Sequence, residues 1–358
     1  MRIEVIKDCE KFQEIKQEWN ILLQKSNSDS IYLTWEWLYT WWEIWGKNGL
    51  SLSIIIVRKK NELIGIAPLF LRKTRWKKLF IIRKLNFLGK SELEVGSNYM
   101  DFIIMKGREK EVLLNLAVFL LESKEIRWNE ILLSSVYEKS NLLLYFLPNF
   151  KQRKGLEINQ ININQCPYIE LPKDWESYLK TLGSNTRRNL RSDRRKLFSS
   201  GRLEYIVYKQ KDAGFYLDDF IAVHRKRWES RLSEDAFLNE RSIQFIKKIT
   251  QLFSELNYLR INFLKHNDKI IAGSYNFIFN GRLYAYQTGV DIDNNKKVSM
   301  GLTEFGFSIE DSIRNGYKEF DFFRLDRDGY KLRLAKGTRM VLDVKISKNS
   351  LAKSLFFK

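Results

Sequence analysis

Two periods of hydrophobic patterning alternate along the chain and predict an α/β fold with mixed sheets. Segments in which every second residue is apolar are typical of strands, and apolar residues three and four positions apart are typical of helices. In the first half, the pattern predicts strands at 2–6, 51–58, 62–71, 128–134 and 155–163, one ending near Met105, and helices at 10–25, 31–46, 108–124 and 139–147. In the second half, it predicts strands at 203–208, 258–266, 269–279, 281–289, 318–323 and 340–346, and helices at 214–230, 236–256 and 302–315.

The two halves share a local pattern around one hairpin each. RKKNELIGIAPLF, from Arg58, and KHNDKIIAGSYNF, from Lys265, both place a polar turn before an apolar pair and then small residues. Any hairpin between buried strands can look like this. With 358 residues, however, the chain is long enough for two cores, so the pattern favours two tandem copies of one α/β unit. We expect the boundary in NQCPYIELP, with domains over 1–165 and 166–358.

A net charge of +19 is the strongest feature of the composition. It favours a polyanionic partner: a nucleotide, a nucleic acid, an anionic lipid or an acidic glycan. Lysine-rich solvated faces explain the same charge without any partner. Charge alone therefore cannot choose among these anions.

The cysteines, the histidines and the N-terminal segment indicate the compartment of the protein and whether it binds a metal. Cys9 and Cys166 lie far apart and suit a reducing compartment, and with only two histidines we expect no metal site. The start MRIEVIKDCEKF lacks a signal-peptide pattern, and no charge-free apolar run reaches about 18 residues. We expect a cytoplasmic protein that can touch the inner face of the membrane.

Two segments of the first half carry polar or aromatic side chains in unusual density. YLTWEWLYTWWEIWG, from Tyr32 to Gly46, is apolar on two helical faces, which is typical of a buried helix; the alternative is an aromatic floor for a sugar or an acyl chain. GSNYMDF places Tyr99 and Asp101 at the start of a strand. These two residues can line a substrate cleft, or they can belong to an ordinary turn.

A basic block, SNTRRNLRSDRRKLFSSG, follows the expected domain boundary. At helical spacing Arg187, Arg191 and Arg194 fall toward one side. Guanidinium groups match phosphate oxygens, so the block predicts a clamp for a nucleotide-linked substrate or a membrane surface. An exposed basic helix without a ligand is the competing interpretation. We expect no DNA, because no recognised DNA-binding motif accompanies the block.

Two further segments of the second half carry candidate chemistry. In VHRKRWESR, His224 lies on a predicted helix one turn before Trp228; a lone helical histidine is often structural, yet imidazole is well suited to accept a proton near neutral pH. In EFDFFRLDRDGYK, a short strand carries Asp321 and leads to Tyr330 and Lys331. Lys331 can pair with phosphate or carboxylate and Tyr330 can donate a proton, whereas an acidic loop after an edge strand is the alternative.

The order of strand, strand, loop, helix and strand from Lys269 to Lys331 resembles the catalytic half of a GNAT-type N-acyltransferase. More closely, the chain resembles the CelD-like acetyltransferases of polysaccharide clusters and the related Fem peptidoglycan aminoacyl ligases. The arginine block, the His224–Arg227–Trp228 pattern and the segment after Asp321 carry this resemblance. It implies two tandem GNAT-like domains and an acidic residue at Asp101 beside a substrate groove.

The resemblance also implies a reaction and its reactants. An acyl group passes from acetyl-CoA or another acyl-CoA to a small-molecule amine, with an amino sugar, free or nucleotide-linked, as the best acceptor. In GNAT enzymes the loop that corresponds to VSMGLTEF binds the pyrophosphate of coenzyme A, which assigns cofactor binding to Ser299, Gly301 and Thr303. This loop has one glycine where the family has more, and Leu325 or Asp326 replaces a usual glycine after Asp321.

Three functions follow as hypotheses from these observations. The favoured one is acyl-CoA-dependent N-acylation, with His224 or Asp321 taking the amine proton, Tyr330 stabilising the thiolate and Lys331 holding a substrate phosphate or carboxylate. The second is a Fem-like ligase that uses charged tRNA, although no long heptad-bearing helical arm is evident. The third is a non-catalytic module that binds an anionic glycan or lipid headgroup.

Overall fold

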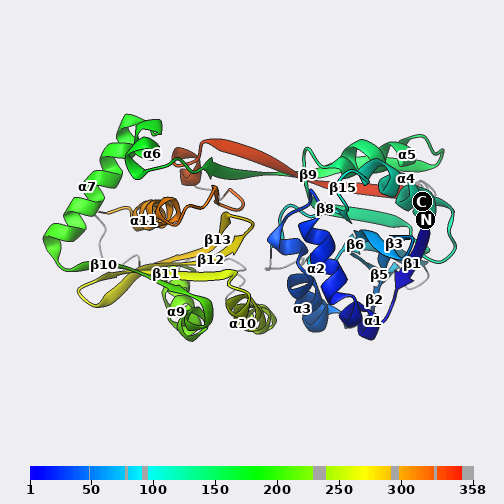
Figure 1. Ribbon diagram of the computed structural model, residues 1–358, viewed down its shortest axis with the longest axis horizontal. Helices are drawn as coiled ribbons and strands as arrows, with labels where there is room; N and C mark the ends of the chain where they lie inside the picture. Colours follow the sequence, from blue (N-terminus) through cyan, green and yellow to red (C-terminus); the bar gives the residue numbers. More distant parts are fainter. Residues whose placement is uncertain are drawn as a thin grey trace. The chain divides into compact units, whose positions relative to one another are not determined.

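The computed structural model describes residues 1–47, 49–76, 80–90, 96–228, 239–291, 298–325 and 329–348. The chain forms two compact units: Met1–Asn164 with Met340–Lys358, and Gln165–Arg339 (Figure 1). The first unit gives way to the second after Asn164, close to the boundary that the sequence suggested. The final strand, which the sequence assigned to the second domain, has its last part in the first unit. The mixed α/β fold is confirmed.

The first unit contains two sheets and the helices that cover them. Its helices are α1 (Cys9–Glu14), α2 (Lys16–Gln24), η1 (Ile31–Leu33), α3 (Trp35–Trp45), α4 (Glu109–Glu122), η2 (Leu142–Phe146) and α5 (Leu147–Lys151). Its strands are β1 (Arg2–Ile6), β2 (Leu50–Leu52), β3 (Ile54–Lys59), β4 (Glu62–Ala67), β5 (Leu69–Trp76), β6 (Phe80–Phe87), β7 (Ile103–Ile104) and β8 (Glu130–Tyr137). One sheet has the order β1-β3-β4-β7, and β2, β5, β6 and β8 belong to the other.

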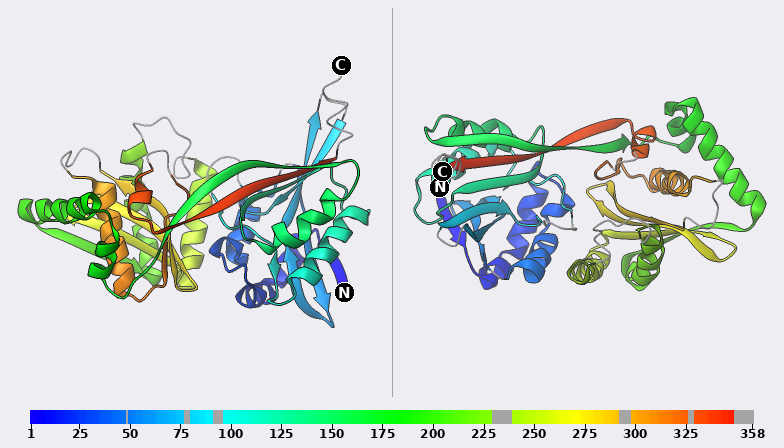
Figure 2. Two further views of the ribbon diagram at one scale, coloured as in Figure 1. Left: turned by 90° about the horizontal axis from the view of Figure 1, so that it is seen from above. Right: turned by 180° about the vertical axis from the view of Figure 1, so that it is seen from behind.

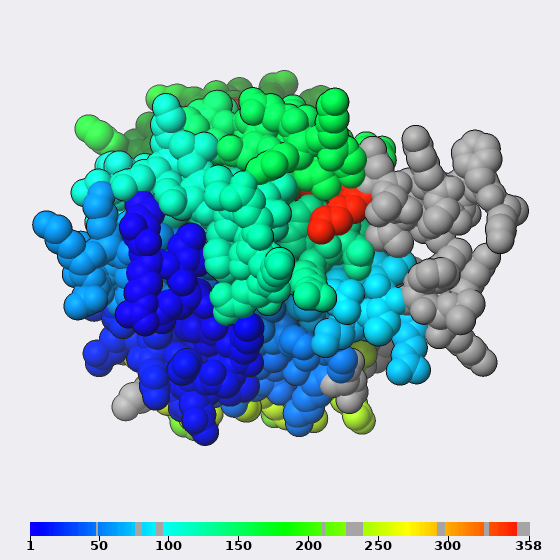
Figure 3. Space-filling view, turned by 90° about the vertical axis from the view of Figure 1, so that its right-hand side faces the viewer, coloured from blue at the N-terminus to red at the C-terminus, as the bar shows by residue number. Residues whose placement is uncertain are grey.

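The aromatic helix α3 is part of the core of the first unit. Trp37 is fully buried and Trp41 is 2% exposed. The indole N–H of Trp37 donates to Ser97 Oγ at 2.9 Å, so the polar edge of this buried ring is satisfied. The core-packing interpretation of the aromatic run is confirmed. In Figure 3, the dark-blue segment from β1 to α2 and the green segment with α4 and α5 form part of the surface of this unit.

The second unit is built on one continuous sheet. Its helices are α6 (Trp175–Thr181), α7 (Ser184–Ser200), α8 (Gln210–Ala213), η3 (Gly214–Tyr216), α9 (Leu217–Trp228), α10 (Glu240–Glu255), α11 (Met300–Arg314) and η4 (Tyr330–Arg333). Its strands are β10 (Leu203–Lys209), β11 (Leu259–His266), β12 (Lys269–Phe279), β13 (Arg282–Val290) and β14 (Glu319–Asp321). The long strands β9 (Leu156–Glu170) and β15 (Gly337–Lys348) contribute residues to both units.

The helices of the second unit lie on both faces of its sheet. α11 lies on one face, and α9 and α10 lie on the other (Figure 1). Two glycines allow this packing. A Cβ at Gly306 would lie 2.9 Å from Leu190 Cδ2, which is where α7 meets α11, and a Cβ at Gly289 would lie 2.7 Å from the backbone of His224 on α9. Close helix contacts on both faces thus depend on positions without a side chain.

The echoing hairpins have the same local topology in the two units. In the first unit β1 pairs with β3 and β3 pairs with β4, all antiparallel; in the second, β10 pairs with β11 and β11 with β12 in the same way. Each unit also has one parallel pair with a helix between its strands in the chain: β6 and β8 flank α4, and β13 and β14 flank α11. The echo in the sequence therefore corresponds to equivalent positions, β4 and β12.

None of the helices in the described ranges is long and apolar enough to cross a membrane.

Candidate active site

The strands β13 and β14 of the second unit separate soon after they begin to pair. Their parallel register covers three pairs only, from Arg282 with Glu319 to Tyr284 with Asp321. β14 ends there, while β13 continues to Val290 beside β12. The crossover helix α11 begins at Met300, beyond the carboxyl end of β13. Open α/β sheets bind ligands outside the carboxyl ends of parallel strands, so this edge is the candidate active site.

The chain turns sharply where β14 ends. Phe323 has φ 62°, a left-handed conformation that is unfavourable for a bulky side chain. Its N–H donates to the Asp321 carboxylate at 2.7 Å, and its ring lies edge-on to Tyr286 of β13, 5.5 Å between centroids. A bulky residue held in this conformation stores strain, which is common at functional sites.

The start of α11 brings together two of the residues that the sequence selected. A Cβ at Gly301 would lie 3.5 Å from the hydroxyl of Tyr330, so this hydroxyl lies over the first turn of α11. The ring of Tyr330 also packs near Phe305, with centroids 6.0 Å apart. Gly329, at φ 60°, precedes it and sets the direction of η4.

A carboxylate that the sequence did not suggest lies at the same helix start. Ser299 precedes α11, and its N–H donates to Asp193 Oδ2 of α7 at 3.2 Å. Asp193 is 6% exposed and also pairs with Lys196 at 3.2 Å. The N–H groups of Met300, Gly301 and Leu302 remain as the donors that a helix start offers to an anion. Thr303, the third cofactor candidate, is fully buried.

Asp321 is the last residue of β14, and Lys331 lies on η4, so the two side chains flank the loop that follows β14. Asp321 is fully buried and also faces Arg339, whose Nη1 lies 3.4 Å from its carboxylate. Arg339 is bound to Glu319 through both of its terminal nitrogens and stacks on Tyr168, 3.9 Å from the ring centroid. Lys331 is 8% exposed, and its Nζ donates to the carbonyl of Arg324 at 2.9 Å. Both side chains therefore fix the loop that carries Tyr330.

His224 lies on the opposite face of the sheet from α11. It is fully buried, and the backbone of α9 at His224 lies against Gly289 near the end of β13. Its ring packs beside Phe220, with centroids 5.6 Å apart. The side chain of Trp228, which the sequence placed in the substrate site, lies outside the described residues.

The three arginines that the sequence selected on α7 have different environments. Arg194 points inward: it pairs with Glu310 at 2.5 Å, and its guanidinium lies over the rings of Phe307 and Trp175, 4.1 Å and 4.7 Å from their centroids. Arg191 is exposed and pairs with Glu176 at 2.7 Å. Arg187 is half-buried, and among the described residues no ion pair involves it.

Tyr99 and Asp101 belong to the first unit. Tyr99 has φ 55°, and its ring is edge-on to Tyr137 with centroids 6.4 Å apart. Asp101 accepts hydrogen bonds from Ser140 Oγ at 2.6 Å and from the Phe102 N–H at 2.7 Å. Burial raises the pKa of the Asp101 carboxyl to about 6, although these hydrogen bonds oppose the shift.

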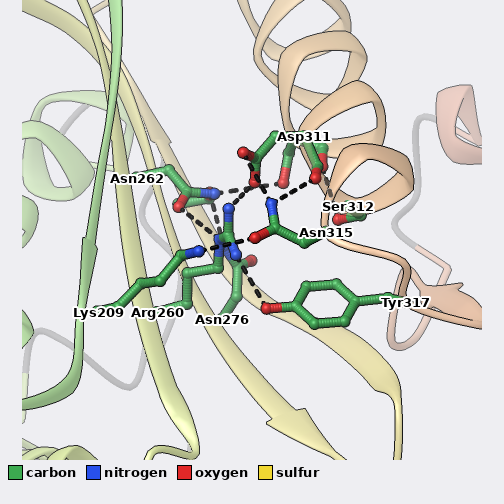
Figure 4. Close-up of polar contacts among 10 residues, drawn as sticks. Lys209, Arg260, Asn262, Asn276, Asp311, Ser312, Asn315 and Tyr317 are labelled. Carbon is green, nitrogen blue, oxygen red and sulfur yellow. Dashed lines mark hydrogen bonds and ion pairs between the residues drawn. The ribbon is translucent and has the colours of Figure 1, made fainter. Parts of the chain in front are cut away.

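A buried polar network lies between α11 and the sheet (Figure 4). Arg260 is fully buried on β11 and forms an ion pair with Asp311 of α11. Its other nitrogens donate to Asn262 Oδ1 at 3.3 Å and to the hydroxyl of Tyr317 at 3.0 Å. Further buried contacts are those of Asn262 with Ser274 and Ser308 and of Asn276 with Ser274. At the exposed edge of the network, Lys209 donates to Asn315.

Glu304 continues this polar seam toward the start of α11. It is fully buried, and burial raises the pKa of its carboxyl to about 7, with the nearby Ser274 hydroxyl opposing the shift. Ser274 pairs with Thr288 across β12 and β13. The sequence analysis missed Glu304, Arg260 and Asp193. The sequence held one signal for Glu304: Ser308 and Asp311 follow it at helical spacing, which places a line of polar side chains on one face of α11.

No group of three or more histidine, cysteine or acidic side chains that could hold a metal occurs among the described residues.

Comparison with known proteins agrees with this geometry. Residues 184–332 match the family described as acetyltransferase (GNAT) domain. No curated protein matches the chain by sequence. Among solved structures, FemX is similar over 100% of both chains, with a TM-score of 0.64 and 11% identity. L-PGS from Bacillus licheniformis is similar over 94% of this chain and 93% of its own, with a TM-score of 0.53 and 11% identity.

A tandem GNAT protein from the clavulanic acid biosynthesis pathway is similar over 96% of this chain and 98% of its own, with a TM-score of 0.51 and 10% identity. At such identities the similarity concerns the fold, which is that of tandem GNAT proteins. The family match covers α7 to η4, including the separation of β13 and β14 and the start of α11. It supports the enzyme class that the sequence suggested, an acyltransferase. Residues 184–332 of this chain thus match a GNAT-type acetyltransferase domain in sequence, and the whole chain is similar in fold to tandem GNAT proteins.

Proposed function

We propose that this protein is an N-acyltransferase that moves an acyl group from acyl-CoA to an amine. One arrangement carries the proposal: Tyr330 lies over Gly301 at the start of α11, where β13 and β14 separate, inside the matched GNAT domain. The acceptor we propose is an amino sugar, free or nucleotide-linked, in the synthesis of a cell-surface polysaccharide. This finer assignment follows the resemblance to the CelD-like acetyltransferases.

The start of α11 supplies the groups that hold the donor. The N–H groups of Met300, Gly301 and Leu302 bind a pyrophosphate oxygen, and Ser299 lies exposed beside them. Asp193 occupies the first donor of this turn, so its charge weakens the attraction for phosphate and Lys196 offsets part of that effect. Among the arginines, Arg187 and Arg191 are the residues that can reach an anionic substrate, because Arg194 points inward.

Tyr330 is the proton donor in this proposal. When the amine has attacked the thioester, the tetrahedral intermediate collapses and the thiolate leaves; the Tyr330 hydroxyl then gives it a proton. Lys331 and Asp321 hold the Tyr330 loop. We propose that the charge of Lys331 also attracts a phosphate or carboxylate of the substrate. His224 and Asp321 are both fully buried, so we propose that the amine proton reaches one of them through a water molecule.

The role of Tyr330 is tested by Tyr330→Phe, with Tyr178→Phe as a matched control. The Tyr178 hydroxyl donates to the buried carbonyl of Leu334 at 3.0 Å in the same core, so its loss should lower the melting temperature without changing kcat. Tyr330→Phe should lower kcat about 10²-fold or more and leave KM for acyl-CoA unchanged. Equal kcat values in the wild type and Tyr330→Phe would remove Tyr330 from the chemistry.

Aminoacyl transfer from charged tRNA is the second candidate. It is favoured by the resemblance to Fem ligases, by the similarity to FemX over the whole of both chains, and by the net charge of +19. The two donors can be separated by thermal shift, with acetyl-CoA, longer acyl-CoAs and tRNA as ligands. Stabilisation by an acyl-CoA supports the first proposal. Stabilisation by tRNA alone would support the second candidate, aminoacyl transfer from charged tRNA.

A further inference from the structure

The hairpin of β5 and β6 extends beyond the sheet to which it belongs. β2 pairs with β5 only from Leu50 with Arg72 to Leu52 with Phe70, and β8 pairs with β6 only from Lys84 onward. Within the described residues, the pairs from Thr74 with Ile82 to Trp76 with Phe80 have no third strand beside them. In the left view of Figure 2, the light-blue end of this hairpin stands clear of the helices of the first unit.

Like charges face each other across this hairpin. Arg72 is directly opposite Lys84, and Lys73 is directly opposite Arg83. Lys84 is neutralised by Glu130 at 3.2 Å. Like charges at directly opposite positions destabilise an antiparallel pair. A hairpin with few neighbours is only marginally stable in water. The two like-charged pairs therefore lower the stability of a part of the sheet that has little stability of its own.

One face of the hairpin carries three cations for which the described part of the chain shows no ion pair. Side chains two positions apart on one strand share a face with those opposite them, which places Lys73, Arg75, Ile81 and Arg83 together. Lys73 and Arg75 are exposed, and Ile81 is 48% exposed. No ion pair found in the described part of the chain involves Lys73, Arg75 or Arg83. We call these four residues the hairpin face.

We propose that the hairpin face docks on an anionic membrane surface. An anion between Lys73 and Arg83 would relieve their repulsion, so the bound state is favoured by charge complementarity. The exposed Ile81 lies among these cations, and an apolar side chain with basic neighbours is suited to the boundary between headgroups and acyl chains. A nucleic acid would use the same charges but would gain little from Ile81. For this reason the lipid surface is the better match.

The test is binding of the full-length protein to sedimented vesicles of phosphatidylcholine mixed with phosphatidylglycerol, compared with phosphatidylcholine alone. A Lys73→Gln, Arg75→Gln, Arg83→Gln variant is compared with the wild type. Each basic residue near an anionic surface contributes on the order of fivefold to partitioning, so the loss should be on the order of a hundredfold. The matched control is Lys110→Gln, Lys124→Gln, Lys139→Gln, which changes the charge of exposed positions of the same unit equally. It should bind as the wild type does.

A second variant separates the lipid from other polyanions. Ile81→Ser keeps all charges and should weaken vesicle binding several-fold, and higher salt should weaken binding by the wild type. Melting temperatures show that each variant is folded. The proposal is overturned if the hairpin variant and the control bind vesicles equally. It is also overturned if Ile81→Ser binds vesicles as the wild type does while the hairpin variant loses affinity for an RNA oligonucleotide.

Discussion

At the scale of single residues, Glu304 is the clearest source of pH dependence. Its carboxyl is fully enclosed between α11 and the sheet, and burial raises its pKa from the ordinary value of 4.5 to about 7. In the unfolded chain this group loses its proton at a lower pH than in the folded protein. The folded state therefore binds more protons between these two values, and its stability falls as the pH rises through them.

Glu304→Gln should flatten this dependence. Below about pH 4.5 the contribution of Glu304 is fully present, and above about pH 7 it is lost, which corresponds to a change on the order of 3 kcal/mol. We expect the wild type to lose free energy of unfolding between about pH 5 and about pH 8 and the variant to lose less. Urea unfolding at the two pH values measures this. The same slope in both proteins would show that Glu304 does not titrate in this range.

Gly289 is a second residue with a specific expectation. A Cβ there would lie 2.7 Å from the backbone of His224, and a backbone cannot move aside as a flexible side chain can. Gly289→Ala should therefore lower the free energy of unfolding by about 1–3 kcal/mol. Gly183→Ala is the control, because nothing lies within 4 Å of a Cβ at Gly183. If the two variants are equally stable, α9 and β13 are not packed as closely as described.

At the scale of elements, α11 is unusual because a polar seam replaces part of its apolar face. Arg260, Asn262 and Ser274 of the sheet meet Ser308 and Asp311 of the helix. Buried ion pairs add little net stability, but removal of one partner leaves a buried charge without compensation. The seam therefore fixes the register of α11 against the sheet, and with it the position of Gly301.

Substitution of Arg260 tests this function of the seam. Arg260→Met should lower the free energy of unfolding by about 3 kcal/mol, reduced to the extent that Asp311, 22% exposed, can be hydrated. Arg260→Met with Asp311→Leu should recover part of the loss, because no charge is then left alone. Equilibrium unfolding of the three proteins measures both effects. A double variant that is less stable than Arg260→Met would contradict the account.

The elements themselves could largely be predicted from the sequence. The helix expected at 302–315 is α11, Met300–Arg314, and the strand expected at 281–289 is β13, Arg282–Val290. Periodicity and turn residues are local signals, and these segments carry both. The pairing of Asp193 with Ser299 could not be predicted, because it joins residues far apart in the chain. For the same reason the sequence analysis missed Arg339, which binds Glu319 from the following strand.

At the scale of the whole molecule, the two units share two local arrangements, although these lie in two sheets in the first unit and in one sheet in the second. Each has an antiparallel hairpin beside the first strand of its sheet and one parallel pair that flanks a helix in the chain. The similar sequence patterns from Arg58 and from Lys265 had indicated the shared hairpin. Nothing local indicated that the chain returns to the first unit after Arg339, because β15 is continuous across the boundary. The match to the GNAT domain family, residues 184–332, lies within the second unit.

The central claim is that the second unit transfers an acyl group from acyl-CoA to an amine, and release of free thiol measures this most directly. The protein is incubated with acetyl-CoA or a longer acyl-CoA, with and without amino-sugar acceptors, next to the Tyr330→Phe variant. The account predicts thiol release that requires the acceptor and falls about 10²-fold or more in the variant. Release equal to that of an enzyme-free control with every donor would contradict it and would favour the tRNA-dependent ligase or a non-catalytic binding module.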